Sequence, residues 1–207
     1  QQMHIKTVLN KCHKFKSFVY EQVKFTGISE TVIEVNIVAR KNAKAVCSNC
    51  GRTAPLYDRL EARRFEFIPL WGYRVFFVYI MRRVSCPSCG VTVERVPWGS
   101  GKRELTSAYM QFLAHWGRKL SWQEVAETFR TSWPKVFYAI EYIVEWGLKE
   151  RELSGVTAIG IDEVSWSKGH KYLTLVYQID SHCTRLLWIG RERTVETLSS
   201  FFHYFGE

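Results

Sequence analysis

The chain has 207 residues, of which 46% are hydrophobic and 15% are aromatic, and its formal net charge is +9. This apolar content can form packed cores, which excludes an intrinsically disordered chain. Residues 1–105 carry 18 Lys and Arg against 8 Asp and Glu, a net of +10, whereas residues 106–207 carry 11 against 12, a net of −1. The uneven distribution predicts a polyanionic partner for the first half. The alternative is a charged surface that only keeps the protein soluble.

Residues 1–31 mix basic and aromatic side chains without a clear pattern, and we treat them as an N-terminal extension. Apolar and polar residues alternate over residues 32–39, which predicts a strand with one buried face. Two more strands are predicted at residues 63–68 and 74–80, with Pro69 and Trp71-Gly72 in the turn between them.

Two Cys-x-x-Cys-Gly motifs flank these last two strands. Cys47 and Cys50 form the first pair, Cys86 and Cys89 form the second, and 35 residues separate the pairs. Four thiolates are the number that a tetrahedral structural zinc ion needs. The insert is longer than in a usual zinc ribbon, so we expect its hairpin to bring the pairs together. The sequence therefore predicts a zinc-binding domain at residues 32–97. A redox-active or purely structural role of the thiols is the alternative.

The insert contains seven arginines and no lysine. Arginine binds phosphates through two parallel hydrogen bonds and stacks on rings, so arginine-rich strands with aromatic residues suit a nucleic-acid surface. The alternative is that the arginine stems cover a thin β-layer. The residues predicted to contact DNA are Arg63, Arg64, Arg74, Arg82 and Arg83 in the insert, and Arg130, Ser132 and Lys135 in the segment that follows.

Residues 98–153 are predicted to be helical. Apolar stripes indicate one helix at residues 109–116 and a second at 120–129. After a two-residue turn, a third helix is predicted to begin at Ser132, a favourable N-cap residue. Short helix, tight turn and long helix form the helix-turn-helix pattern, in which the last helix enters a major groove of DNA. Because the last helix offers Lys135 as its one early cation, a helical hairpin without a DNA-binding role is the alternative.

The pattern changes to strands after residue 154. The predicted elements are strands at residues 158–161, 172–177 and 186–189 and a helix from residue 197. We expect the first strand to end at the acidic pair Asp162-Glu163, and this order of elements is typical of the opening of a ribonuclease-H-like sheet. An Asp at that strand end can bridge two Mg²⁺ ions. An acidic residue at a strand end is otherwise usually a solvated turn residue.

The order of these parts resembles the N-terminal portion of bacterial insertion-sequence transposases of the ISL-three family, which are DDE-type enzymes. The matching pieces are the two cysteine motifs, the helical segment 120–148, and the blocks GIDEV at residues 160–164 and KGHKY at 168–172. The resemblance implies that Asp162 is the first carboxylate of a catalytic triad that binds Mg²⁺. It assigns no triad role to Asp180.

The resemblance also implies transposition, in which DNA strands are cleaved and transferred at the terminal inverted repeats of an insertion sequence. The second Asp and the final Glu of the family's triad have no counterpart before residue 207, so we expect a truncated copy with an incomplete catalytic site. Two alternatives remain. One is a zinc-dependent DNA-binding regulator derived from a transposase, and the other is a zinc-stabilised interaction protein.

The expected protein is a cytoplasmic, nucleoid-associated DNA-binding protein that can form homo-oligomers, with no membrane partner, because its longest apolar run is short and flanked by arginines. Its six cysteines fit a reducing compartment better than a disulfide framework. The predicted fold class is α+β with several domains. These are an N-terminal extension at residues 1–31, a zinc-binding β-module at 32–97, a helix-turn-helix domain at 98–153, and a truncated ribonuclease-H-like α/β catalytic domain at 154–207.

Overall fold

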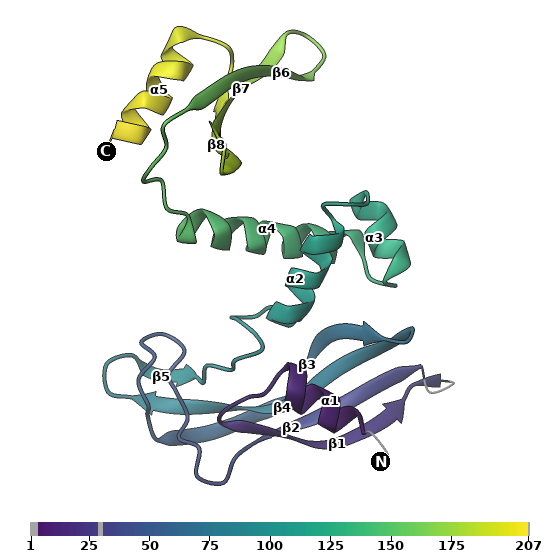
Figure 1. Cartoon of the computed structure of the whole chain (residues 1–207). Coiled ribbons are helices and arrows are strands. Elements are labelled where there is room, and N and C mark those ends of the chain that lie inside the picture. Colours follow the sequence, from purple (N-terminus) through teal and green to yellow (C-terminus); the bar gives the residue numbers. More distant parts are fainter. Residues whose placement is uncertain (1–3, 29–30, 207) are drawn as a thin grey trace. The chain divides into compact units, whose positions relative to one another are not determined.

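The computed structural model describes residues 4–28 and 31–206 (Figure 1). The predicted chain end at Glu207 and the first three residues of the predicted N-terminal extension lie outside the described residues. The chain divides into two compact units, Gln1–Lys149 and Glu150–Glu207. Both units combine helices with a β-sheet, which confirms the α+β class. In the described part of the chain, no helix has the length and apolar character needed to cross a bilayer.

The first unit contains a five-stranded mixed sheet. The strands lie in the order β1 (Phe18–Thr26), β2 (Val32–Ala39), β4 (Tyr73–Cys86) and β3 (Leu56–Leu70), and β5 (Gly90–Val93) also pairs with β4. The β2–β4 pair is parallel and the others are antiparallel. Because β1 pairs along β2, the sheet extends into the segment that the sequence analysis treated as an N-terminal extension. A bulge between Tyr20 and Val23 breaks the alternation of β1, which hides this strand in the sequence.

The β3–β4 hairpin is longer than predicted at both ends. Its turn lies at Trp71-Gly72, where both residues have positive φ angles, 49° and 83°. Two left-handed residues match the right-handed twist of the flanking strands. Pro69, which the sequence placed in the turn, is instead part of β3. It lies where the register shifts between Phe67 and Leu70, a position that does not need the missing N–H.

Trp98 is at the centre of the sheet's core and is 2% exposed. Its ring centroid lies 4.9 Å from that of Phe18, 5.1 Å from Phe15 and 5.3 Å from Tyr79. Such edge-on and tilted pairs stabilise a core beyond the area that they bury. Many aromatic residues of the first half therefore fill a core, whereas Trp71 and Tyr57 are exposed. The helix α1 (Ile5–Cys12) adds Leu9 to this core.

Three helices complete the first unit: α2 (Ser107–Trp116), α3 (Trp122–Thr128) and α4 (Trp133–Glu150). They lie where the sequence predicted them. Ser121 caps α3 through a capping box with Glu124, in which each side chain bonds the other residue's N–H. Arg130, with a φ of 50°, ends the turn before α4. The buried face of these helices joins Leu113, Val125, Val136 and Ala139 in a second core.

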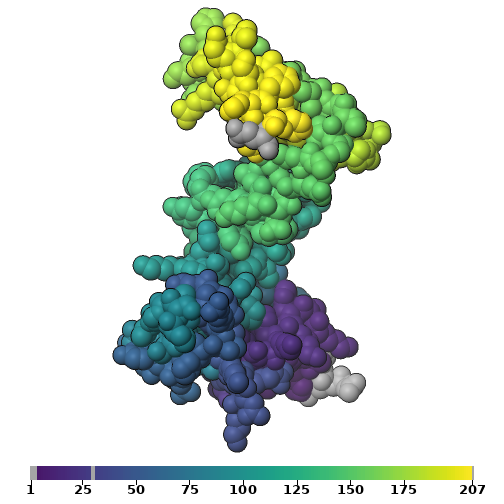
Figure 2. Space-filling model, turned by 90° about the vertical axis from the view of Figure 1, so that its left-hand side faces the viewer, coloured from purple at the N-terminus to yellow at the C-terminus, as the bar shows by residue number. Residues whose placement is uncertain are grey.

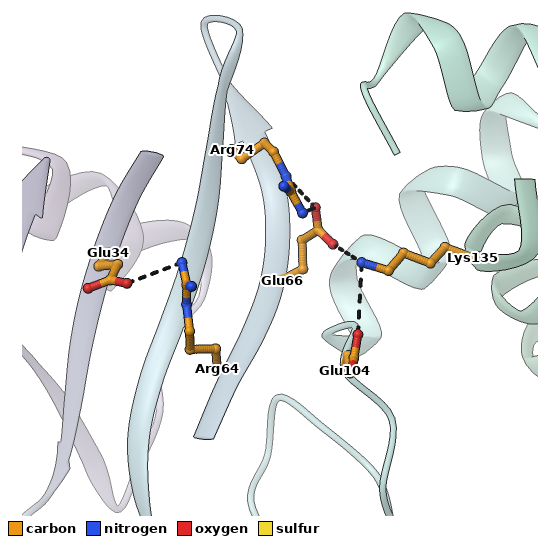
Figure 3. A network of polar contacts seen from close by, with 6 residues as sticks. All are labelled: Glu34, Arg64, Glu66, Arg74, Glu104 and Lys135. Atoms are coloured by element: carbon orange, nitrogen blue, oxygen red, sulfur yellow. Dashed lines mark hydrogen bonds and ion pairs between the residues drawn. The ribbon is translucent and has the colours of Figure 1, made fainter. Parts of the chain in front are cut away.

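Glu66 links the sheet to the helices (Figure 3). This glutamate of β3 is 3% exposed, and its carboxylate lies 2.9 Å from Nη2 of Arg74 and 2.7 Å from Nζ of Lys135. Its backbone N–H donates to the carbonyl of Glu104, and its own carbonyl accepts from the N–H of Thr106. The first turns of α4 are thus tied to the middle of the hairpin by one buried charge and its two cations.

The second unit is a three-stranded antiparallel meander followed by a helix. Its elements are β6 (Ile159–Ser167), β7 (Lys171–Asp180), β8 (Cys183–Arg191) and α5 (Val195–Gly206). The strands lie in the order β6-β7-β8. Val176, Leu187 and Phe201 form its buried core, so α5 packs on one face of the sheet. The three strands and the helix are those that the sequence predicted, each extended by several residues.

Substitution of Glu94 tests what stabilises the first unit. Its carboxylate is buried and accepts hydrogen bonds from the hydroxyl of Tyr79 at 2.6 Å and from Nη2 of Arg82 at 2.6 Å. Glu94→Ala leaves the Arg82 charge buried without a partner, so we expect the free energy of unfolding to fall by about 3 kcal/mol. Urea unfolding measures this loss.

The matched control removes a partner of an exposed ion pair. Lys24 lies 3.2 Å from Glu34, with a side chain that is 46% exposed. Lys24→Ala should lower the free energy of unfolding by less than about 1 kcal/mol. Equal losses for the two variants would show that the buried pair has no special role.

Candidate metal centre and nucleic-acid interface

The four cysteines of the two motifs meet in the first unit. Their sulfur atoms all lie within 4.8 Å of one another, and the Sγ atoms of Cys50 and Cys86 are 3.5 Å apart. Tetrahedral zinc with Zn–S bonds of about 2.3 Å places its sulfurs at comparable separations. The four cysteines can therefore bind a metal ion such as zinc.

The β3–β4 hairpin brings the two pairs together, as expected. Cys86 is the last residue of β4, and Gly90 begins β5 directly after Cys89. Gly51 and Gly90 follow the two motifs with φ angles of 72° and 73°, a conformation that glycine adopts without a steric penalty. In the first motif the N–H of Gly51 donates to the carbonyl of Cys47 at 3.0 Å. Each knuckle thus turns sharply enough to direct two sulfurs to one point.

The electrostatics of the cluster favour a bound cation. The hydroxyl of Thr92 lies 3.2 Å from Sγ of Cys47, and this hydrogen bond, with backbone N–H groups near the sulfur, lowers the pKa of Cys47 to about 6. The hydrogen bond with Cys50, together with burial, raises the pKa of Cys89 to about 12. Four thiolates this close together would repel one another. A divalent cation removes that repulsion and permits four thiolates.

The arginines predicted to contact DNA are occupied within the first unit. Four of them pair with carboxylates: Arg64 with Glu34 at 3.1 Å, Arg74 with Glu66, Arg82 with Glu94, and Arg83 with Asp58. The fifth, Arg63, donates to the carbonyls of Gly101 at 2.8 Å and Arg103 at 2.6 Å. The guanidinium of Arg64 also lies over the ring of Phe76. These contacts match the alternative in which arginine stems cover the β-layer.

The helical residues predicted to contact DNA have different surroundings. Lys135 is paired with Glu66 and lies 3.9 Å from Glu104 (Figure 3). Ser132 directly precedes α4, and its carbonyl accepts from the N–H of Val136 at 3.2 Å. Arg130 is exposed, and its side chain has no polar partner within residues 4–28 and 31–206. Of the three, Arg130 has the cationic side chain that is available to an external phosphate.

Asp162 does not lie at a strand end, which corrects the expectation from the sequence. It lies within β6 opposite Leu175, because β6 continues to pair with β7 as far as Ser167. Its side chain is exposed, and Oδ1 accepts the N–H of Glu163 at 2.8 Å. Glu163 is on the other face of the strand. In the described part of the chain, the four cysteines are the only close group of three or more His, Cys, Asp or Glu residues.

Asp180 is buried and hydrogen-bonded within the second unit. Its carboxylate is buried and accepts hydrogen bonds from the hydroxyl and N–H groups of Thr157 and from Nε2 of Gln178 at 2.6 Å. These bonds, first of all the one from Thr157, lower the pKa of Asp180. The side chain thus connects the start of the second unit to the end of β7. Its contacts agree with leaving Asp180 out of a catalytic triad.

Comparison with known proteins gives two kinds of match. A family model described as a transposase, of the DDE ISL-three type, matches residues 159–207. The transposase for insertion sequence element IS1557 of Mycobacterium tuberculosis is 34% identical over 164 residues, which are 77% of this chain and 36% of that protein. The transposase for insertion sequence element IS1001 of Bordetella parapertussis is 28% identical over 170 residues, which are 81% of this chain and 41% of that protein.

The matched residues span well under two thirds of the length of either relative. No solved structure matches the chain. The two relatives and the family model point to the same group of proteins, which is also the group that the cysteine motifs and the GIDEV block indicate. The predicted resemblance is thereby confirmed, and this chain is related to the insertion-sequence transposases of the ISL-three family.

Proposed function

We propose that this chain supplies the DNA-binding region and the first catalytic strand of an insertion-sequence transposase. The observation that carries the proposal is the family match, which begins at the first residue of β6 and includes Asp162. Both relatives are named as transposases. The proposed activity is therefore transposition in the bacterial cytoplasm, with duplex DNA as the partner.

The proposed role of the cysteine cluster is structural. Four cysteine ligands leave no coordination position for water or substrate, which is characteristic of structural zinc. A zinc ion held by Cys47, Cys50, Cys86 and Cys89 would fix the end of β4 to the loop that begins at Cys47. It would hold this end of the sheet together and would take no part in strand cleavage.

DNA binding is proposed for the first unit. The net charge of +10 in residues 1–105 supports contact with phosphates. The helices α3 and α4 have the lengths and the tight turn of a helix-turn-helix, and Arg130 lies exposed in that turn. The terminal inverted repeats of the element are the proposed specific target. A homo-oligomer that holds two element ends together is part of this proposal.

Asp162 is proposed as the first carboxylate ligand of a catalytic Mg²⁺ site. Its side chain is exposed on β6, so it is open to a metal ion and a phosphate. Two-metal phosphoryl transfer needs several carboxylates around both ions, with Mg²⁺ stabilising the attacking and leaving oxygens. Asp162 would contribute one of these ligands. Further carboxylates are required before strand cleavage can occur.

The zinc proposal predicts a specific loss of structure. Cys86→Ser, or a strong chelator, should unfold the first unit's sheet, because binding energy at a thiolate site is folding energy. Elemental analysis of the purified protein should give one zinc per chain. Cys183→Ser, which lies outside the cluster, is the matched control and should keep the metal. Protein that contains no zinc and folds normally in chelator would contradict the proposal.

The DNA proposal predicts salt-dependent binding. If about five phosphates are neutralised, a plot of log affinity against log salt concentration should have a slope of roughly −4 to −5. Fluorescence anisotropy with labelled duplex DNA measures this slope. Preference for a terminal-repeat duplex over a shuffled one would favour a transposase over a general regulator. Affinity that does not depend on salt would refute DNA binding through this charge, in favour of an interaction protein.

The catalytic proposal predicts inactivity of residues 1–207 alone. Because no carboxylate cluster surrounds Asp162 in the described residues, this polypeptide should not cleave duplex DNA with Mg²⁺ or Mn²⁺. Addition of the C-terminal segment of a full-length relative should restore cleavage, and Asp162→Asn should then abolish it while Glu163→Gln has less effect. Cleavage by residues 1–207 alone that Asp162→Asn abolishes would overturn this assignment.

A further inference from the structure

Among the exposed cations of the first unit that have no carboxylate partner in the described part of the chain, five lie on neighbouring loops. They come from three loops: the one after α1, the one after β2, and the one after β5. We call them the basic patch, and its members are Lys16, Arg40, Lys41, Lys44 and Arg95. Their charge is not neutralised internally, in contrast to that of Arg64, Arg74, Arg82 and Arg83 of the β3–β4 hairpin.

Hydrogen bonds to backbone carbonyls hold the three loops together. The N–H of Arg40 donates to the carbonyl of Ser17 at 2.9 Å, and its Nε donates to the carbonyl of Lys16 at 3.1 Å. The N–H of Arg95 donates to the carbonyl of Val46 at 2.7 Å. In the lower part of Figure 2 the purple N-terminal part of the chain and the blue part around residues 40–50 adjoin. The loops that carry the patch residues are therefore held at a fixed place on the fold.

A hollow of about 200 Å³ lies between these loops. Lys16, Lys44 and Arg95 line it, and Glu94 is the one carboxylate in its lining. Glu94 is already neutralised by Arg82. The one aromatic residue in the lining, Phe18, is 6% exposed. The hollow thus offers positive charge and no exposed ring on which a base could stack.

We propose that the basic patch binds the phosphate backbone of duplex DNA. This inference rests on the proposed function and specifies which surface performs the binding. Cations without base-stacking partners bind phosphates and carry no sequence information. A zinc ion with four thiolates would add a formal charge of −2 near Cys47, which leaves the five-cation patch positive. The patch therefore gives sequence-independent affinity, and the hairpin arginines contribute little to it.

The test compares two triple variants of the full chain that lower the net charge equally. The patch variant is Lys16→Gln, Lys44→Gln and Arg95→Gln, and the hairpin variant is Arg59→Gln, Arg64→Gln and Arg83→Gln. Anisotropy with a duplex of arbitrary sequence gives the salt slope of each protein. The patch variant should have a slope that is shallower by about 2.7, since each lost phosphate contact removes about 0.9. The hairpin variant should lose less than about 1, because carboxylates already neutralise two of its arginines.

Further measurements keep the outcomes distinct. Circular dichroism and zinc content show whether each variant is folded. The double variant Lys16→Arg and Lys44→Arg keeps both charges and should retain the wild-type salt slope. An unchanged slope in a folded patch variant, or a larger loss in the hairpin variant, would overturn the patch while leaving DNA binding in place. Wild-type protein without salt-dependent binding would instead refute the proposed function. If the patch variant loses binding to anionic lipid vesicles but binds duplex DNA with the wild-type slope, the patch belongs to a membrane surface and the proposal is overturned.

Discussion

The buried carboxylate of Glu66 is the constraint on which the arrangement of the first unit depends. A charge with 3% exposure is tolerated only with close partners, and here they come from two different elements, Arg74 of β4 and Lys135 of α4. If the helices moved away from the hairpin, Glu66 would lose Lys135 and keep only Arg74 as a charged partner. The backbone bonds of Glu66 with Glu104 and Thr106 hold the connecting segment at the same point.

This constraint changes which charges are available to DNA. The arginine-rich hairpin has the composition of a phosphate-binding surface, yet most of its guanidinium groups bind carboxylates and carbonyls of the same unit. Lys135, in the first turn of α4, forms an ion pair with Glu66. In the described residues, the exposed cations without a carboxylate partner include those of the basic patch and Arg130. Net charge identifies the half of the chain that carries the excess of cations, while pairing decides which of these cations are available to an external anion.

The sequence predicted the structure correctly where a local pattern is compatible with only one structure. The two cysteine motifs, the strand at residues 32–39 and the three helices needed only spacing and periodicity to be found. The sequence was not informative where contacts between residues far apart in the chain decide the structure. The bulge in β1 removes that strand's alternation, and pairing with β7 extends β6 beyond Asp162. The burial of Glu66 has no local signal, because its neighbours Phe65 and Phe67 are also buried and its partners lie elsewhere in the chain.

The most direct test of this account measures stability and DNA binding of one variant, Lys135→Met, side by side. The account predicts that the free energy of unfolding falls by about 3 kcal/mol, because a buried carboxylate loses one of its two partners. It also predicts that the salt slope of duplex binding stays at the wild-type value. A variant with wild-type stability and a slope that is shallower by about 1 would show that Lys135 contacts a phosphate, which would contradict the account.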